Sequence, residues 1–357
     1  MKSPEQTISP AQRLVVLAAA VLTAASGASV GAHAPDIARF VVSGLALACL
    51  AALVGISTEK VGEHFGPGPT GLLQSTLGNL PELFVAIFAL RLGMTAVVQA
   101  ALVGSLLSNM LLVLGSAFLL GAGRHGNQHF SPEAPRMMAT LLTLAVAALL
   151  VPTLAKHLSA PASHHTAALS DAGAVALLAV YAASVPFWLR GGPETRAPAI
   201  PSAPQWRLTS STTVLGLASV ASAAVSEWFV DALRPAAHAL GLSQVFTGLV
   251  VVAIASNAVE HATGVRFAWK ARPDFAISTV LSSPLEVALF LTPLLVLVSH
   301  LIGPAQLTLV FPPLLVAALA IGTIVVAIVI YDGEYSWLEG AALVALYVIV
   351  AAAFWWG

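Results

Sequence analysis

Two Asn-x-x-Glu motifs place carboxylates inside apolar segments of this 357-residue chain. The first contains Asn79 and Glu82, the second contains Asn257 and Glu260, and about half the length of the chain separates the two glutamates. A charged side chain inside a segment of membrane-spanning length is costly and usually has a function. A polar motif that recurs in both halves of an apolar chain indicates a transporter site at the interface between two repeats.

Further polar residues follow each motif at matching distances. Ser105 follows Glu82 at the same interval at which Ser283 follows Glu260, and Glu286 adds a third carboxylate. Ser108 and Asn109 occupy the comparable place in the first half. Asn and Glu at positions i and i+3 share one face of a helix. Two such faces would offer a set of hard oxygen ligands, which suits Ca²⁺ with its about 6–8 oxygen ligands and makes Zn²⁺ and Cu⁺ poor candidates.

A pair of carboxylates in a low-dielectric site implies competition between a cation and protons. Because like charges repel, one carboxylate retains a proton unless a cation is bound. Binding of Ca²⁺ would then expel protons, and protons would expel Ca²⁺, which is the minimal mechanism of a cation/proton antiporter. Glu82 and Glu260 are the predicted shared groups, and His261 is either a proton relay or a packed histidine. Ser105, Ser283 and Glu286 could instead have structural roles, the serines in close helix packing and Glu286 in bonding to a neighbouring helix.

The composition predicts an all-α polytopic membrane protein. Hydrophobic residues make up 58% of the chain and charged residues 9%, whereas soluble domains carry about 25% charged residues. A spanning helix needs about 20 mainly apolar residues. Eleven such segments are predicted, at residues 12–31, 37–58, 70–92, 95–121, 135–156, 168–190, 211–234, 242–269, 274–300, 305–330 and 337–356.

The eleven predicted spans divide into one N-terminal helix and two five-helix repeats. Residues 1–36 hold a polar tail and the first helix, residues 37–190 the first repeat, and residues 208–357 the second. The segment 191–207 is rich in proline and basic residues and is predicted to be a cytoplasmic linker. Five spans is an odd number, so the second repeat is expected to be inverted relative to the first.

Lysine and arginine in the connections predict the orientation. With the N-terminus in the cytoplasm and the C-terminus outside, eleven of the 15 Lys and Arg residues fall on the inner side. The first helix also resembles a signal peptide, with Ala32-His33-Ala34 as a cleavage-like site, but a retained helix is expected. The expected setting is a bacterial-type inner membrane, with the lipid bilayer and transported ions as partners. No nucleic-acid partner and no cofactor are expected, and a homo-oligomer is compatible with the sequence.

Prolines near the motifs predict interrupted helices. Pro81, together with Gly78, is expected to break the third span, and Pro284 can break the ninth in the same way. No comparably strong signal interrupts the eighth span at Ser256-Asn257. Backbone carbonyls freed at such breaks can serve an ion where they line a cavity.

The motifs resemble those of a known family. The segment from Gly78-Asn79-x-x-Glu82-Leu83 to Leu90, with Gly104-Ser105 to Asn109, looks like the first conserved repeat of the cation/proton exchanger branch of the calcium/cation antiporter superfamily. Asn257-x-x-Glu260-His261-Ala262 and Ala288-Leu289-Phe290 resemble the second. The resemblance covers spans 2–11. It implies Ca²⁺ export against proton entry, with Glu82 and Glu260 as principal ligands and Asn79 and Asn257 beside them.

Three departures from the family pattern keep an alternative open. Pro81 stands where Thr is usual and is more like the sodium/calcium exchangers, and Ser256 stands where Gly is usual. Ser282-Ser283-Pro284-Leu285-Glu286 replaces a usual Gly-Ser-Ser-Leu-Gln. Exchange of Ca²⁺ for Na⁺ or another cation on the same fold is therefore the alternative. An intramembrane enzyme is not expected, because His261 beside Glu260 does not make a His-Glu-x-x-His motif. A structural subunit would not need duplicated carboxylates.

Overall fold

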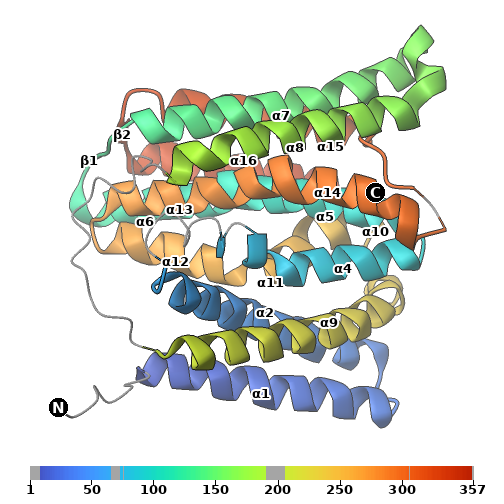
Figure 1. The fold of residues 1–357 in the computed structure, drawn as a ribbon. Coiled ribbons are helices and arrows are strands. Elements are labelled where there is room, and N and C mark those ends of the chain that lie inside the picture. Colours follow the sequence, from blue (N-terminus) through green and yellow to red (C-terminus); the bar gives the residue numbers. More distant parts are fainter. Residues whose placement is uncertain (1–8, 66–72, 75, 190–205, 305, 356–357) are drawn as a thin grey trace. The chain divides into compact units, whose positions relative to one another are not determined.

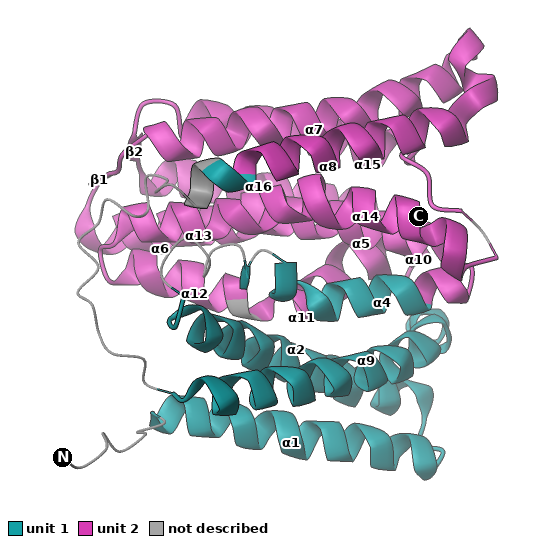
Figure 2. Ribbon diagram, viewed as in Figure 1, with its two compact units in different colours: residues 1–88, 185–240 teal, residues 89–184, 241–357 magenta. Residues whose placement is uncertain are grey.

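The computed structural model describes residues 9–65, 73–74, 76–189, 206–304 and 306–355, and these are mainly helical. The chain divides into two compact units (Figure 2). Unit 1 contains residues 1–88 and 185–240, and unit 2 contains residues 89–184 and 241–357. Each unit thus combines segments from both halves of the sequence. The compact units are defined by contacts in space, whereas the predicted repeats are defined by similar sequence. The layout of two repeats over 37–190 and 208–357 therefore stays a prediction.

Unit 1 is built mainly from long helices, and it also contains the start of α4 and residues 185–189 of α8 (Thr166–Leu189). The helices of unit 1 are α1 (Pro10–Gly31), α2 (Asp36–Gly62), the start of α4 (Leu80–Arg91) and α9 (Leu208–Ala239) (Figure 1). Small residues let α2 approach its neighbours closely. The Ser26 and Ser43 hydroxyls lie 2.7 Å apart between α1 and α2, and the ring of Phe40 stacks on Phe229 of α9 at 4.9 Å. The predicted linker at 191–207 lies outside the described residues, apart from 206 and 207.

Unit 2 holds the remaining elements, most of which are apolar helices. They are α5 (Thr95–Leu107), η1 (Ser108–Val113), α6 (Leu114–His125), β1 (Gln128–His129), α7 (Glu133–His157), η2 (Pro161–His165), α8 (Thr166–Leu189), α10 (Gln244–Phe246), η4 (Thr247–Val252), α11 (Ala253–Ser256), α12 (Ala258–Trp269), α13 (Pro273–Glu286), η5 (Val287–Leu291), α14 (Thr292–Ile302), α15 (Pro313–Val329), β2 (Glu334–Tyr335) and α16 (Trp337–Ala353).

The described helices account for most of the predicted spans by length and composition. Seven helices or continuous helical segments in the described part of the chain are long and apolar enough to cross a membrane. A bent pair, Gln244–Ser256 with Glu260–Trp269, makes an eighth candidate, while α15 and α16 are apolar but shorter. These findings establish a helical membrane protein. The count of eleven spans stays a prediction.

The centre of unit 2 is the continuous segment Thr95–His125, formed by α5, η1 and α6. In its most apolar 18-residue stretch 83% of the residues are buried, compared with 11% in the corresponding stretch of α1. Two glycines allow α5 to cross η4 at very short range. A Cβ atom on Gly104 would overlap the backbone of Leu249, and one on Gly248 would lie 2.6 Å from the Val97 carbonyl oxygen. This crossing brings α5 against the segment that leads to the second motif.

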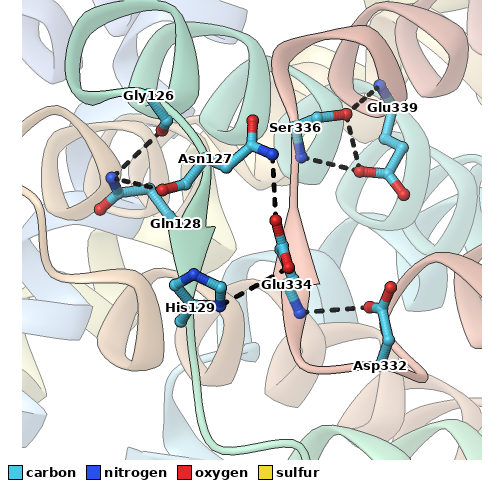
Figure 3. Close-up of polar contacts among 8 residues, drawn as sticks. All are labelled: Gly126, Asn127, Gln128, His129, Asp332, Glu334, Ser336 and Glu339. Carbon is cyan, nitrogen blue, oxygen red and sulfur yellow. Dashed lines mark hydrogen bonds and ion pairs between the residues drawn. The ribbon is translucent and has the colours of Figure 1, made fainter.

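A two-stranded sheet joins two connections at one end of unit 2, a feature that an all-α prediction omits. β1 pairs antiparallel with β2, with Gln128 opposite Tyr335 and His129 opposite Glu334. Figure 3 shows that Glu334 also accepts a hydrogen bond from the Asn127 side chain at 3.0 Å and lies 3.7 Å from the His129 ring. These contacts tie the connection between α6 and α7 to that between α15 and α16.

Candidate functional site

The first motif lies where a helix is interrupted within unit 1. The chain turns at residues 78–79, and α4 then begins at Leu80, with Glu82 in its first turn. The Leu83 amide donates to the Asn79 carbonyl at 2.9 Å. Asn79 and Glu82 are 7% and 6% exposed. The predicted break beside Gly78 and Pro81 is confirmed, and proline is tolerated because it occupies the first turn of the new helix.

The second motif lies at a sharper break in unit 2. Helix α11 ends at Ser256 and α12 begins at Ala258, with a bend of 64° between Gln244–Ser256 and Glu260–Trp269. The sequence offered no strong signal for this break. The structure supplies its cause, because the Asn257 side-chain amide donates back to the Ala253 carbonyl at 3.0 Å and competes with regular helical bonding.

The two motifs share one local geometry. The His261 amide donates to the Asn257 carbonyl at 3.1 Å, as the Leu83 amide does to the Asn79 carbonyl. In both cases the asparagine precedes the helix and the glutamate lies in its first turn. The i and i+3 spacing of Asn and Glu is therefore set at the start of a helix, with Asn directly before its first residue. The break puts each carboxylate near a helix N-terminus, where the helix dipole favours negative charge.

A buried polar network surrounds the second motif in unit 2. The Asn257 side-chain amide donates to the Ser105 hydroxyl at 3.1 Å and to the Ser256 hydroxyl at 3.1 Å. The Asn109 side-chain amide donates to the Ser105 carbonyl at 3.1 Å and the Ser283 hydroxyl at 3.4 Å. All five residues are buried. The structure thus brings Ser105, Asn257 and Ser283 together, as the matched spacings suggested.

Asn109 is as good a candidate ion ligand as any other residue in this network. It lies in the π-helical turn η1, and π turns frequently mark functional sites because they widen the helix and re-aim side chains. Its Oδ1 atom is buried and accepts no hydrogen bond from the described residues. In the sequence, Asn109 stands out only because it lies on the span after the first motif. The burial of its oxygen is visible only in the structure.

Glu286 lies in a helix that remains continuous, so the break expected at Pro284 is wrong. Helix α13 passes through Pro284 and leads without interruption into η5 and α14, over Pro273–Ile302. The π turn η5 begins at Val287, directly after Glu286. Glu286 is half-buried and has interaction partners.

Glu260 and His261 are half-buried side chains at the start of α12. Within the described residues, neither the Glu260 Oε2 atom nor the His261 Nε2 atom has a hydrogen-bond partner, although both atoms are buried. A buried carboxylate oxygen without a donor is costly unless a proton or a cation satisfies it. No group of three or more His, Cys, Asp or Glu side chains arranged around a metal is found in the described part of the chain. The available ligands are mainly neutral oxygens with individual carboxylates, a donor set that fits Ca²⁺.

The chain matches known membrane transporters over nearly its full length. The family model for sodium/calcium exchanger proteins matches residues 36–189 and 210–356. A Ca²⁺/H⁺ antiporter of Synechocystis sp. is 37% identical over 338 residues, covering 88% of this chain and 90% of that protein. The Ca²⁺/H⁺ antiporter ChaA of Bacillus subtilis is 35% identical, covering 90% and 93%.

A solved structure agrees with the fold. The structure of native YfkE has a TM-score of 0.82 at 30% identity, covering 96% of this chain and 99% of that one. The matching family and relatives are ion exchangers, so the chain is a transporter and not an enzyme. The chain belongs to the sodium/calcium exchanger protein family, in its cation/proton exchanger branch, which confirms the resemblance carried by the motifs.

Proposed function

We propose that this protein exports Ca²⁺ in exchange for H⁺, with Glu82 and Glu260 binding either Ca²⁺ or protons. One observation carries the proposal. Each half of the chain interrupts a helix at Asn-x-x-Glu and puts the carboxylate in the first turn of the next helix. The names of the Synechocystis and Bacillus relatives support the choice of ions.

The proposed Ca²⁺ ligands are the two motifs and the polar residues that follow them. They are Asn79 and Glu82 of the first motif, Asn257 and Glu260 of the second, and Ser105, Ser283 and Glu286. The Asn257, Ser105 and Ser283 side chains belong to one hydrogen-bonded network. Because amide and hydroxyl oxygens carry no net charge, two or three carboxylates would balance one Ca²⁺ and exchange it for protons. Ca²⁺ and H⁺ are substrates here, and no cofactor is proposed.

The proposed repeats extend over residues 37–190 and 208–357. The same family model matches 36–189 and again 210–356, which supports this division. The π turns add support, because η1 begins at Ser108 and η5 at Val287, at nearly equal intervals after Glu82 and Glu260. Two inverted repeats would let each face of the membrane gain access to the site in turn, so alternating access is part of the proposal.

Transport by purified protein in liposomes tests the proposal. Ca²⁺ uptake is measured with an imposed proton gradient, with and without Na⁺, for the wild-type protein and Glu82→Gln. We expect uptake that needs the proton gradient and does not depend on Na⁺. We also expect the variant to lose this uptake. Ca²⁺ movement that follows a sodium gradient at clamped pH would instead select sodium/calcium exchange. Pro81 and Glu286, which depart from the proton-exchanger pattern, favour that second candidate.

The proposed orientation has the N-terminus in the cytoplasm and the C-terminus outside, in a bacterial-type inner membrane. The excess of Lys and Arg on one set of connections supports it. Replacing Cys49 by Ser and adding single cysteines at exposed Gly123 or Leu240 allows labelling by a membrane-impermeant maleimide in intact cells. Labelling of Leu240→Cys but not Gly123→Cys is expected, and the reverse pattern would invert the topology.

A further inference from the structure

Exposed basic residues gather at the hairpin between α12 and α13 in unit 2. Arg266 lies in the last turn of α12, and Lys270 and Arg272 lie in the connection to Pro273. All three cations are exposed. The end of α6 lies beside this hairpin (Figure 1), where the Arg124 guanidinium sits 4.4 Å from the centre of the Trp269 ring.

The hairpin holds these charges in a defined arrangement. The Lys270 amide donates to the Arg266 carbonyl at 3.2 Å, and the Arg272 amide donates to the Phe267 carbonyl at 3.0 Å. Between them Ala271 adopts a left-handed conformation with φ of 53°. The His125 ring nitrogen Nε2 lies 3.1 Å from the Trp269 carbonyl oxygen and ties the end of α6 to the turn. The cations therefore project from a compact, bonded turn.

The charge of this tip is strongly one-sided. From Arg266 to Asp274 the chain carries three full positive charges and one negative charge, and Arg124 adds a fourth positive charge. The single acid, Asp274, accepts a hydrogen bond from the Ser131 backbone amide at 2.8 Å. Stacking on an aromatic ring orients the Arg124 guanidinium and leaves its planar fork of N–H donors for an oxyanion.

Exposed aromatic rings accompany the cations. Trp269 is 47% exposed and Phe275 is 44% exposed. The Arg272 guanidinium lies 5.9 Å from the centre of the Phe275 ring. Tryptophan beside lysine and arginine at the end of an apolar helix is typical of the level of the lipid headgroups. A soluble anion would have no use for the exposed rings, whereas a lipid offers a phosphate to the cations and acyl chains to the aromatic side chains.

We infer that the α12–α13 hairpin, with Arg124 of α6, binds the headgroup of an anionic phospholipid. The binding site is distinct from the polar network, but the same helix links them: α12 begins beside Asn257 and Glu260 and ends at Trp269. A lipid held at Trp269 restrains the far end of the helix that carries the second motif. The position of this helix is thereby coupled to the charge of the surrounding lipid.

Lipid selectivity of the purified protein tests this inference. The protein is placed in nanodiscs of phosphatidylcholine with about one-third phosphatidylglycerol, and bound lipids are measured by native mass spectrometry and with spin-labelled lipids. The test variant is Lys270→Gln/Arg272→Gln. The matched control is Lys156→Gln/Arg234→Gln, which removes the same charge from two other exposed positions. Lipid binding is read independently of transport, so the outcome does not depend on the proposed exchange activity.

We expect the wild-type protein and the control to retain phosphatidylglycerol preferentially. Each cation near an anionic surface contributes about fivefold in affinity, so removing two should lower the selectivity of the test variant about 25-fold. Equal selectivity in the test variant and the wild type, or an equal loss in both double variants, would overturn the inference. Displacement of the bound lipid by millimolar inorganic phosphate would also overturn it, because the site would then recognise a free anion. Unchanged melting temperatures of both variants exclude misfolding as the cause.

Discussion

The Asn257 side-chain amide donates a hydrogen bond to the Ser105 hydroxyl across 3.1 Å, joining residues 152 positions apart. The bond connects the break before α12 to α5, where Ser105 is fully buried. Asn257 also bonds to the Ala253 carbonyl, so the same amide both interrupts the helix and ties it to its neighbour. The geometry of the second motif therefore depends on α5 as much as on its own segment.

A double-mutant cycle on this pair should show strong coupling. Ser105→Ala leaves the Asn257 amide with one acceptor fewer in a buried site, and Asn257→Ala removes the donor. Each change is expected to cost about 1–3 kcal/mol of stability, with the double variant losing less than the sum. Melting temperatures in detergent measure the cycle. Strict additivity would mean that the bond does not contribute to stability.

Neutralising either motif carboxylate should abolish exchange without unfolding the protein. Glu82→Gln and Glu260→Gln keep the side-chain shape but remove the charge that binds Ca²⁺ and the group that accepts the proton. A loss of at least about 10–100-fold in Ca²⁺ uptake is expected, since weaker changes around metal ligands already have such effects. Asp36→Asn is the control, because its pair with Arg39 at 3.5 Å is exposed. Normal exchange by both glutamine variants would refute the site.

The crossing of α5 and η4 should not tolerate a side chain at Gly104. Gly104→Ala places a methyl group against the Leu249 backbone, and overpacking of this kind costs about 1–3 kcal/mol or more. Gly123→Ala is the matched control in α6, where an added Cβ meets no atom of the described residues within 4 Å. That change should be neutral or stabilise the helix by about 0.5–1 kcal/mol. Thermal melts and expression yields distinguish the two, and equal behaviour would contradict the crossing.

Lys60 is a buried cation near the end of α2 in unit 1. Its side chain is 7% exposed, it forms an ion pair with Glu63, and its Nζ lies 3.8 Å from the Glu59 carboxylate. Lys60→Met leaves two carboxylates without their shared cation and should destabilise the protein by about 1–3 kcal/mol, less than a fully buried pair because Glu63 is part-exposed. Adding Glu63→Met should restore part of the loss. A melting temperature unchanged by Lys60→Met would show that the pair is energetically neutral.

Tyr335 should make the protein sensitive to alkali. The side chain is 1% exposed, its ring stacks on Phe118 at 4.0 Å, and burial raises the pKa of Tyr335 to about 12. A raised pKa in the folded state means that stability is complete below about pH 10 and falls as the pH rises to about 12. The loss at pH 11 is about 1 kcal/mol.

Tyr335→Phe removes this alkaline loss of stability, because phenylalanine cannot ionise. Melts from pH 9 to pH 11.5 should therefore fall less steeply for the variant than for the wild type. Parallel curves would show that Tyr335 ionises equally in the folded and unfolded chains. At neutral pH the variant should be at least as stable, because the buried hydroxyl has no hydrogen-bond partner among the described residues.

The class of protein, its family and most candidate site residues can be predicted from the amino-acid sequence alone. Sustained apolar segments predict membrane helices, because only lengths of about 20 apolar residues match a bilayer. The recurrence of Asn-x-x-Glu in each half of the chain identified the carboxylates, and the equal spacing to Ser105 and Ser283 identified two members of the network. The break at Gly78 and Pro81 was also predictable, since proline acts through its own ring and missing amide.

How these residues are held depends on contacts between distant parts of the chain, which the sequence does not reveal. The break at Asn257 depends on a side chain that can bond to its own backbone or point elsewhere, and contact with Ser105 favours one outcome. Pro284 did not break its helix, which runs on through Glu286 into η5 and α14. The burial of the Asn109 oxygen likewise arises from neighbouring helices. Local residues set the available conformations, whereas packing between segments far apart in the chain selects among them.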